Sequence, residues 1–225
     1  MISTLNQRSN FHNSCEDSIY VGHSYDVIYG VIADGCSTGT KSHFASQLIA
    51  YSVESNARFN TLLSDSFVKS ILFDLRSSAK VLNLTDSNLL STCLLFAYYP
   101  HLKRLQLRLF GDGVYYINDI EYRIDQNNEP DYLGYLINKD YSDIDKYLLK
   151  YPIIEYTDVH KFIICSDGID RIERTVLQEP AKVDPLKLLL HPPTSANYLT
   201  RMWNLIKRDG FTLSDDLSII SYAGS

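Results

Sequence analysis

Acidic residues stand at the ends of several apolar stretches of this 225-residue chain. Two of these stretches, VIYGVIADG and KFIICSDG, end in the same Asp-Gly pair, at Asp34-Gly35 and at Asp167-Gly168. A carboxylate followed by a glycine, which allows close backbone approach, is suited to holding a cation or a phosphate. The other acidic positions beside apolar stretches are Glu16, Asp17, Asp112, Asp215 and Asp216. Taken singly, each position is better explained as an ordinary turn.

The recurrence of this pattern favours a shared site. If the strand ends converge, several carboxylates meet, and two of them roughly 4 Å apart repel by about 4 kcal/mol at an effective dielectric constant near 20. Such a cluster is physically sensible only around cations. Because ligation by oxygen alone selects hard ions, the sequence predicts a site for Mg²⁺ or Mn²⁺ and not for zinc.

Strands are expected to position these acids. The apolar, β-branched and aromatic run 27–32 predicts a strand buried on both faces, and 19–22 predicts its hairpin partner. In a later run, Leu105, Leu107 and Leu109 alternate with polar residues, which indicates one buried and one wet face. The further predicted strands are 91–99, 114–117, 160–165 and 217–222.

Helices are expected between the strands. Residues with helix-start chemistry follow the first Asp-Gly pair, namely Ser37, Thr38, Gly39 and Thr40. Apolar residues at helical spacing over 68–82 predict a second helix, with Asp65 as its cap. Two more helices are predicted, at 185–190 and at 195–209.

The segment 118–159 is the least regular part of the sequence, and it carries seven tyrosines. Long surface excursions of this kind are often functional or mobile. No repeat, linker or low-complexity tract divides the chain, so residues 1–225 are expected to form a single domain. Because strands and helices fall in separate blocks, the predicted fold class is α+β with mainly antiparallel sheets.

Composition argues against several classes of partner. The net charge of −6 and the scattered basic residues argue against nucleic acid. No apolar window reaches about 18 residues and MISTLNQRSN lacks an apolar core, so neither a membrane span nor a signal peptide is expected. The four cysteines lack CxxC or zinc spacing, which indicates reduced thiols in the cytoplasm. Cys15, Cys36 and Cys165 lie close to acidic motifs, either as redox-sensitive thiols or as buried small residues.

The order of the motifs ED, VIADG, STCLLFAYY, GDG, FIICSDG and DDLSIIS resembles that of the metal-dependent protein phosphatases of type 2C, above all their compact bacterial and phage branch. The match runs from Glu16 to Tyr222, and the shared order and spacing are more specific than any single motif. The resemblance implies a four-layer α-β-β-α sandwich, in which helices flank two mainly antiparallel sheets. It also implies a two-metal site at one edge.

The resemblance assigns roles to residues of this chain. Asp34 would bridge two metal ions, and Asp167 and Asp215 would complete the shell of one of them. Glu16 and the carbonyl oxygen of Gly35 would hold the other ion.

Further acids have implied roles. Asp17 would form hydrogen bonds with metal-bound water. Asp112 matches an acid that, with Asp167, holds a third and weaker ion, although a glycine-flanked hairpin turn explains Asp112 equally well. Of the pair Asp215-Asp216, the family pattern makes the first residue the ligand.

Two positions depart from the family pattern. Cys36 stands where many members have a histidine that is suggested as the acid for the leaving alcohol. His12 stands where many members have an arginine that grips the phosphate, and Arg8 lies one helical turn earlier. His12 could serve as acid, as phosphate ligand or in neither role.

The implied activity is hydrolysis of phosphoserine or phosphothreonine in proteins, by water activated between two Mg²⁺ or Mn²⁺ ions and without a Cys or Ser nucleophile. The expected partner is a phosphorylated protein substrate, and a monomer is the simplest expectation for the chain itself. Two alternatives stay open: hydrolysis of a small phosphorylated metabolite, and a binding module of the same fold without turnover. The retained ligand positions favour an enzyme.

Overall fold

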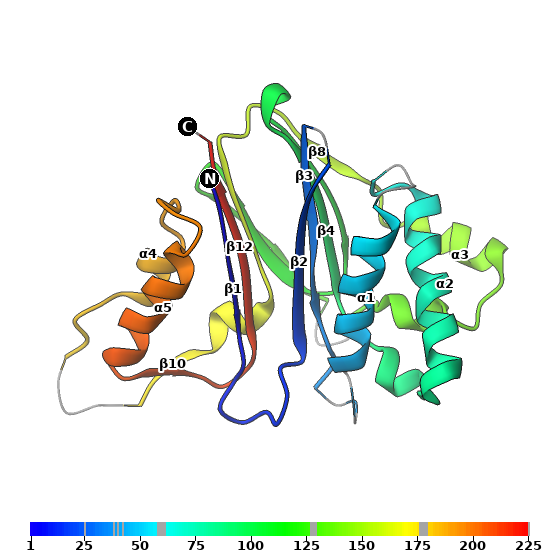
Figure 1. Ribbon diagram of the computed structural model, residues 1–225, viewed down its shortest axis with the longest axis horizontal. Helices are drawn as coiled ribbons and strands as arrows, with labels where there is room; N and C mark the ends of the chain where they lie inside the picture. Colours follow the sequence, from blue (N-terminus) through cyan, green and yellow to red (C-terminus); the bar gives the residue numbers. More distant parts are fainter. Residues whose placement is uncertain are drawn as a thin grey trace.

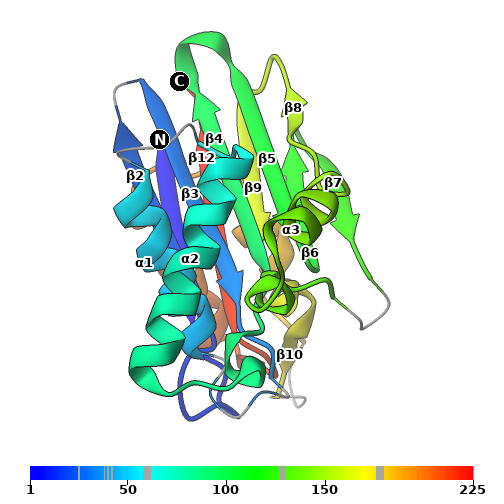
Figure 2. The same ribbon diagram turned by 90° about the vertical axis from the view of Figure 1, so that its right-hand side faces the viewer.

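The computed structural model describes residues 1–24, 26–37, 39, 41, 43–57, 62–126, 130–175 and 180–224. Two antiparallel five-stranded sheets form the inner layers of the fold. Helices cover the outer face of each sheet, so the fold is a four-layer α-β-β-α sandwich (Figures 1 and 2). The predicted α+β class is confirmed.

The sheets are built from segments far apart in the sequence. The first sheet contains, in spatial order, β1 (Ile2–Gln7), β12 (Leu217–Ala223), β9 (Lys161–Cys165), β6 (Gly113–Ile117) and β7 (Ile120–Ile124). The second contains β2 (Asp17–Ser24), β3 (Val27–Asp34), β4 (Cys93–Tyr99), β5 (Arg104–Phe110) and β8 (Ile154–Tyr156). A separate pair joins β10 (Ile172–Arg174) to β11 (Phe211–Leu213).

Each sheet has its own helical layer. The second sheet is covered by α1 (His43–Asn56), α2 (Asp65–Leu82) and α3 (Tyr141–Leu148), and the first by α4 (Pro185–Leu189) and α5 (Tyr198–Arg208). Short 3-10 turns are η1 (Asp86–Leu89), η2 (Pro100–Leu102), η3 (Leu133–Leu136) and η4 (Asp167–Arg171). None of the helices in the described ranges combines the length and the apolar character needed to cross a membrane.

Three apolar clusters hold the layers together, one between the sheets and one under each helical layer. Strand β3 contributes to two of them because its side chains alternate between its faces. Tyr29 and Val31 pack under α1 and α2, whereas Ile28 and Ile32 face the other sheet. Trp203 of α5 belongs to the third cluster.

Most predicted elements are present. β2 and β3 form the expected hairpin, in which Asp17 pairs with Asp34. The prediction that Asp65 caps α2 is wrong, because the Ser64 side chain accepts the hydrogen bond from the Phe67 backbone N–H. The acidic side chain of Asp65 lies instead in the first helical turn, where the helix dipole favours a negative charge.

The sequence gives little sign of β1, which pairs along its whole length with β12. The buried positions of β1 are Ser3 and Leu5, and the small polar serine hides the apolar alternation of the strand. Of the predicted start residues for the first helix, Thr38 and Thr40 lie outside the described residues.

The hairpin explanation of Asp112 is wrong. Strand β5 belongs to the second sheet and β6 to the first, so the residues 111–113 carry the chain from one sheet to the other. Gly111 adopts φ +85°, a conformation that suits glycine.

The segment 118–159 is more regular than the sequence indicates, since it contains β7, η3, α3 and β8. Residues 127–129 within it lie outside the described residues. Apolar residues Leu133, Ile144 and Leu148 of this segment join the cluster under the second sheet's helices.

The predicted wet face of β5 is wrong at Arg108, which is 2% exposed. Its guanidinium donates to the backbone carbonyls of Leu63, Leu148 and Tyr151 and forms an ion pair with Asp65 (2.7 Å). Arg108 therefore ties the start of α2 and the end of α3 to the second sheet.

Replacing Arg108 with Ala should lower the free energy of unfolding by about 2–4 kcal/mol, because three buried carbonyls lose a charged donor. Arg104→Ala is the matched control on the same strand, and it should cost less than about 1 kcal/mol because its ion pair with Glu155 is partly exposed. Urea unfolding measures both changes. Equal losses in the two variants would contradict an anchoring role for Arg108.

Candidate functional site

A cavity of about 650 Å³ is lined by residues from the end of the sandwich where β1 leads into β2. This end of the sandwich is at the bottom of Figure 1. Five aspartates line the cavity: Asp34, Asp112, Asp131, Asp167 and Asp215. Asp34 is at the end of β3, and Asp112 is in the link between the two sheets. Asp131 follows β7, Asp167 is in the turn after β9, and Asp215 comes just before β12. The structure thus brings four of the acidic motifs found in the sequence to one place.

The pairing of β2 with β3 sets Asp17 beside Asp34. The backbone N–H of Asp34 donates to Thr92 Oγ1 (3.0 Å), and the Thr92 N–H donates to the Asp34 carbonyl (2.8 Å). Asp17 is 2% exposed, and the Ser166 hydroxyl donates to its Oδ2 (2.8 Å). The other oxygen, Asp17 Oδ1, is buried and receives no hydrogen bond from a described residue. An orphaned carboxylate oxygen is costly in isolation and fits a place beside a hydrated cation.

Close contact between the turn after β9 and the start of β12 positions Asp167. The Ser166 N–H donates to the Ser218 carbonyl (3.0 Å), and the Ser166 hydroxyl accepts from the Ser218 N–H (3.0 Å). A Cβ atom on Gly168 would lie 1.8 Å from the carbonyl oxygen of Asp216. Only glycine fits there, which explains the Asp-Gly pair at this strand end.

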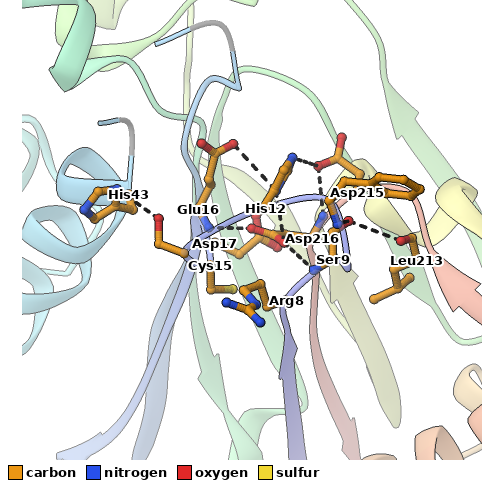
Figure 3. A network of polar contacts seen from close by, with 12 residues as sticks. Arg8, Ser9, His12, Cys15, Glu16, Asp17, His43, Leu213, Asp215 and Asp216 are labelled. Carbon is orange, nitrogen blue, oxygen red and sulfur yellow. Dashed lines mark hydrogen bonds and ion pairs between the residues drawn. The ribbon is translucent and has the colours of Figure 1, made fainter. Parts of the chain in front are cut away.

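Asp216 is buried and is not among the cavity's lining residues. Its carboxylate accepts hydrogen bonds from the backbone N–H groups of Ser9 (2.6 Å) and Glu16, and it lies 3.2 Å from Nδ1 of His12 (Figure 3). Asp216 therefore fixes both ends of the loop between β1 and β2.

His12 lies between Glu16 of this loop and Asp215, which comes just before β12 (Figure 3). Its Nδ1 is 3.8 Å from Glu16 Oε2, and its Nε2 is 3.9 Å from Asp215 Oδ1. Burial alone would lower the pKa of His12, but the hydrogen bond and charge of Asp216, together with Glu16 and Asp215, raise it. Of the predicted site residues, His12, Glu16 and Asp17 are not among those that line the cavity.

Burial and mutual repulsion raise the pKa of the clustered carboxyl groups. Burial raises the pKa of Asp17 to about 7. Burial, followed by the charges of Asp17 and Asp167, raises the pKa of Asp34 well above its ordinary value. Burial and neighbouring acids also raise the pKa of Asp112 and of Asp215. A bound cation would reverse these shifts by favouring the charged forms.

The donors fit hard divalent ions that keep part of their water. Within the described ranges, no three His, Cys, Asp or Glu side chains lie close enough together to hold an ion by themselves. Mg²⁺ usually retains several water molecules and binds through one or two carboxylates. Asp34, Asp167 and Asp215 offer such carboxylates to one cavity, and the adjoining Gly35 lines it as well.

Several residues that line the cavity have no signal in the sequence, among them Asp131, Tyr132 and Arg171. Tyr132 is buried, and it lines the same cavity as Cys36. Asp131 and Tyr132 belong to the segment 118–159, whose path depends on tertiary packing. No local motif identifies either residue.

Neither a protein-family model nor a curated protein matches this sequence. Solved structures do match its fold. Stp1, a serine/threonine phosphatase from Staphylococcus aureus, has a TM-score of 0.66 at 12% identity, over 100% of this chain and 94% of that one. The catalytic domain of the serine/threonine protein phosphatase PstP, in complex with two manganese ions, has a TM-score of 0.60 at 16% identity, over 98% and 96%.

RsbX in complex with magnesium has a TM-score of 0.58 at 17% identity, over 97% of this chain and 92% of that one. The fold is therefore that of the bacterial type 2C serine/threonine phosphatases. The resemblance found in the sequence motifs is confirmed at the level of the fold.

The raised pKa values predict how the stability of the metal-free protein depends on pH. Between about pH 4 and pH 7 the folded protein keeps a proton on Asp17 that the unfolded chain releases, so stability falls as pH rises through this window. In chelator, the melting temperature should be lower at about pH 8 than at about pH 6. Mn²⁺ should remove much of this difference.

Replacing Asp34 with Asn should raise the melting temperature of the chelated protein at about pH 8, because one repelling charge is removed. Mn²⁺ at a hundredfold excess over Kd should stabilise the unmodified protein by about 2.7 kcal/mol and the variant much less. Asp26→Asn, at an exposed position, is the control for the loss of one negative charge. A destabilised Asp34 variant with a normal response to Mn²⁺ would contradict the ion site.

Proposed function

We propose that this protein is a Mg²⁺- or Mn²⁺-dependent phosphatase that hydrolyses phosphoserine and phosphothreonine in proteins. The observation that carries the proposal is the convergence of Asp34, Asp112, Asp167 and Asp215 on one cavity from four separate strand ends. The shared fold with serine/threonine phosphatases supports the same activity.

The residues have distinct proposed roles. Asp34 would bridge two ions, with Asp167 and Asp215 on one side and Glu16 and the Gly35 carbonyl on the other. When bound, the two ions would lower the pKa of a water molecule and neutralise charge on the phosphoryl oxygens.

Two residues outside the cavity lining, the buried Asp17 and the half-buried His12, would support this arrangement. Asp17 has an oxygen without a donor and would orient water beside Asp34. His12, held by Asp216, would keep Glu16 and Asp215 in place through its positive charge, or protonate the leaving alcohol.

Asp112 would contribute to a third, weaker site together with Asp167. Its Oδ1 accepts a hydrogen bond from the Gln126 backbone N–H (2.8 Å). Because Asp112 also lines the cavity, it would have its other oxygen for an ion.

The test is hydrolysis of p-nitrophenyl phosphate and of a panel of phosphopeptides by the chelated protein, with and without added Mn²⁺ or Mg²⁺. We expect metal-dependent release of phosphate, with phosphopeptides preferred over small phosphoesters and no activity in Asp34→Asn. Faster hydrolysis of small phosphoesters than of phosphopeptides would indicate that the substrate is a small phosphorylated metabolite. Phosphopeptide binding without turnover would identify a binding module, and the absence of both would refute the proposal.

Substitutions of the neighbouring acids Asp215 and Asp216 should have different effects on metal binding and on stability. Asp215→Asn should weaken Mn²⁺ binding and lower kcat at least 100-fold, without lowering the melting temperature in chelator, because it removes a cavity carboxylate. Asp216→Asn should lower the melting temperature, because an amide group offers one acceptor fewer to the Ser9 and Glu16 N–H groups. Calorimetric titration with Mn²⁺ and thermal unfolding measure both. The same profile in the two variants would refute this division of roles.

A further inference from the structure

Arg171 is the last residue of η4, the turn that begins at Asp167, and its side chain is exposed. Among the described residues that line the main cavity, it is the only one with a cationic side chain. It also lines a neighbouring cavity of about 170 Å³, which shares Asp112 and Asp167 with the main one. Arg171 therefore lies where the two cavities meet.

The guanidinium of Arg171 has no hydrogen-bond or ion-pair partner among the residues that the structure describes. Its backbone is fixed, because its carbonyl accepts a hydrogen bond from the Ser214 N–H (3.0 Å). The adjacent acid, Asp170, is paired with Arg123, whose two terminal nitrogens both donate to its carboxylate. The acid next to Arg171 in the chain thus already has a partner, so the guanidinium stays available.

The charge of the cavity lining explains why a guanidinium at this position would favour phosphate binding. Five aspartates and one arginine line the main cavity. Two divalent cations together with Arg171 would bring the formal charge of these residues to zero. Without Arg171 the lining would stay negative even with both ions bound, and it would repel a phosphate dianion at short range.

The positions considered for phosphate binding from the sequence are occupied by other contacts. His12 lies 3.2 Å from Asp216, and Arg8 donates a hydrogen bond to the Asn13 carbonyl (2.7 Å). Neither residue lines the cavity.

We propose that Arg171 binds the phosphoryl group of the substrate, a proposal that rests on the proposed function above. The planar guanidinium can donate two parallel hydrogen bonds to phosphate oxygens, which lysine does not reproduce. Because Arg171 and Asp167 share one short turn, the phosphate ligand and a proposed metal ligand are held in register with each other. The substrate class is a phosphomonoester dianion whose phosphoryl group can enter the cavity lined by the five aspartates.

The experiment compares Arg171→Ala, Arg171→Lys and Arg201→Ala with the unmodified protein. Arg201 is an exposed arginine of α5 that contacts Ser195 and lies outside the cavity, so it controls for the loss of one positive charge. Three quantities are measured with Mn²⁺ present: KM for a phosphoserine peptide, the inhibition constant of inorganic phosphate, and the Kd of phosphate by calorimetry. A fourth measured quantity is the Kd of Mn²⁺ in the absence of phosphate.

Arg171→Ala should raise KM and both phosphate constants by about 10- to 100-fold, the range expected for a lost charge-assisted hydrogen-bond pair. Arg171→Lys should recover part of the loss, and Arg201→Ala should change nothing beyond twofold. The affinity for Mn²⁺ should not weaken in Arg171→Ala, since a nearby positive charge is removed. Unchanged phosphate constants, or a loss that is matched by weaker Mn²⁺ binding, would overturn the proposal.

The two proposals fail separately. Turnover that persists unchanged in Arg171→Ala would refute the role of Arg171 and leave the phosphatase function standing. If the protein shows no turnover but its phosphate binding depends on Arg171, the phosphatase function is refuted and the role of Arg171 stands. A protein that neither hydrolyses phosphoesters nor binds phosphate would overturn both.

Discussion

The repulsion among carboxylates gathered at one end of the sandwich is the constraint that the rest of the fold must withstand. Asp17 cannot swing away from Asp34, because both belong to the ladder between β2 and β3. Asp167 is held by a turn packed directly onto the backbone of Asp216. Apolar clusters on both sides of each sheet stabilise this backbone. Their burial offsets the repulsion, so the acids stay close together in the folded protein.

The adjacent acids before β12 illustrate how a strand separates two tasks. Successive side chains of an extended chain point to opposite sides. Asp215 therefore reaches the cavity, while Asp216 turns inward and organises the loop between β1 and β2. A carboxylate that accepts two backbone N–H groups acts as a structural cap. The same loop carries Glu16 and His12, so the buried side chain of Asp216 helps to set the positions of several residues of the candidate site.

The sequence was sufficient for features that depend on local pattern and insufficient for those that depend on tertiary packing. β3 was predictable because its apolar run is buried on both faces, and the Asp-Gly pairs were predictable because each is a short motif. The buried face of β5 at Arg108 was not, since α3 covers it from far along the chain. Arg171 and Tyr132 have ordinary sequence surroundings, and only the assembled cavity distinguishes them. The path of residues 111–113 between the sheets likewise follows from pairings made elsewhere.

The pairing of β1 with β12 has a consequence for the order of events during protein synthesis. Ile2 pairs with Tyr222 and Gln7 with Leu217, so β1 gains its neighbour only after the whole stretch up to β12 has left the ribosome. Contacts at such sequence separation form slowly, because a very long loop must close first. Asp215 and Asp216 arrive with β12, and the loop of Glu16 is fixed only then. A chain that lacks β12 therefore lacks Asp215 and Asp216 and cannot assemble the acidic end of the sandwich.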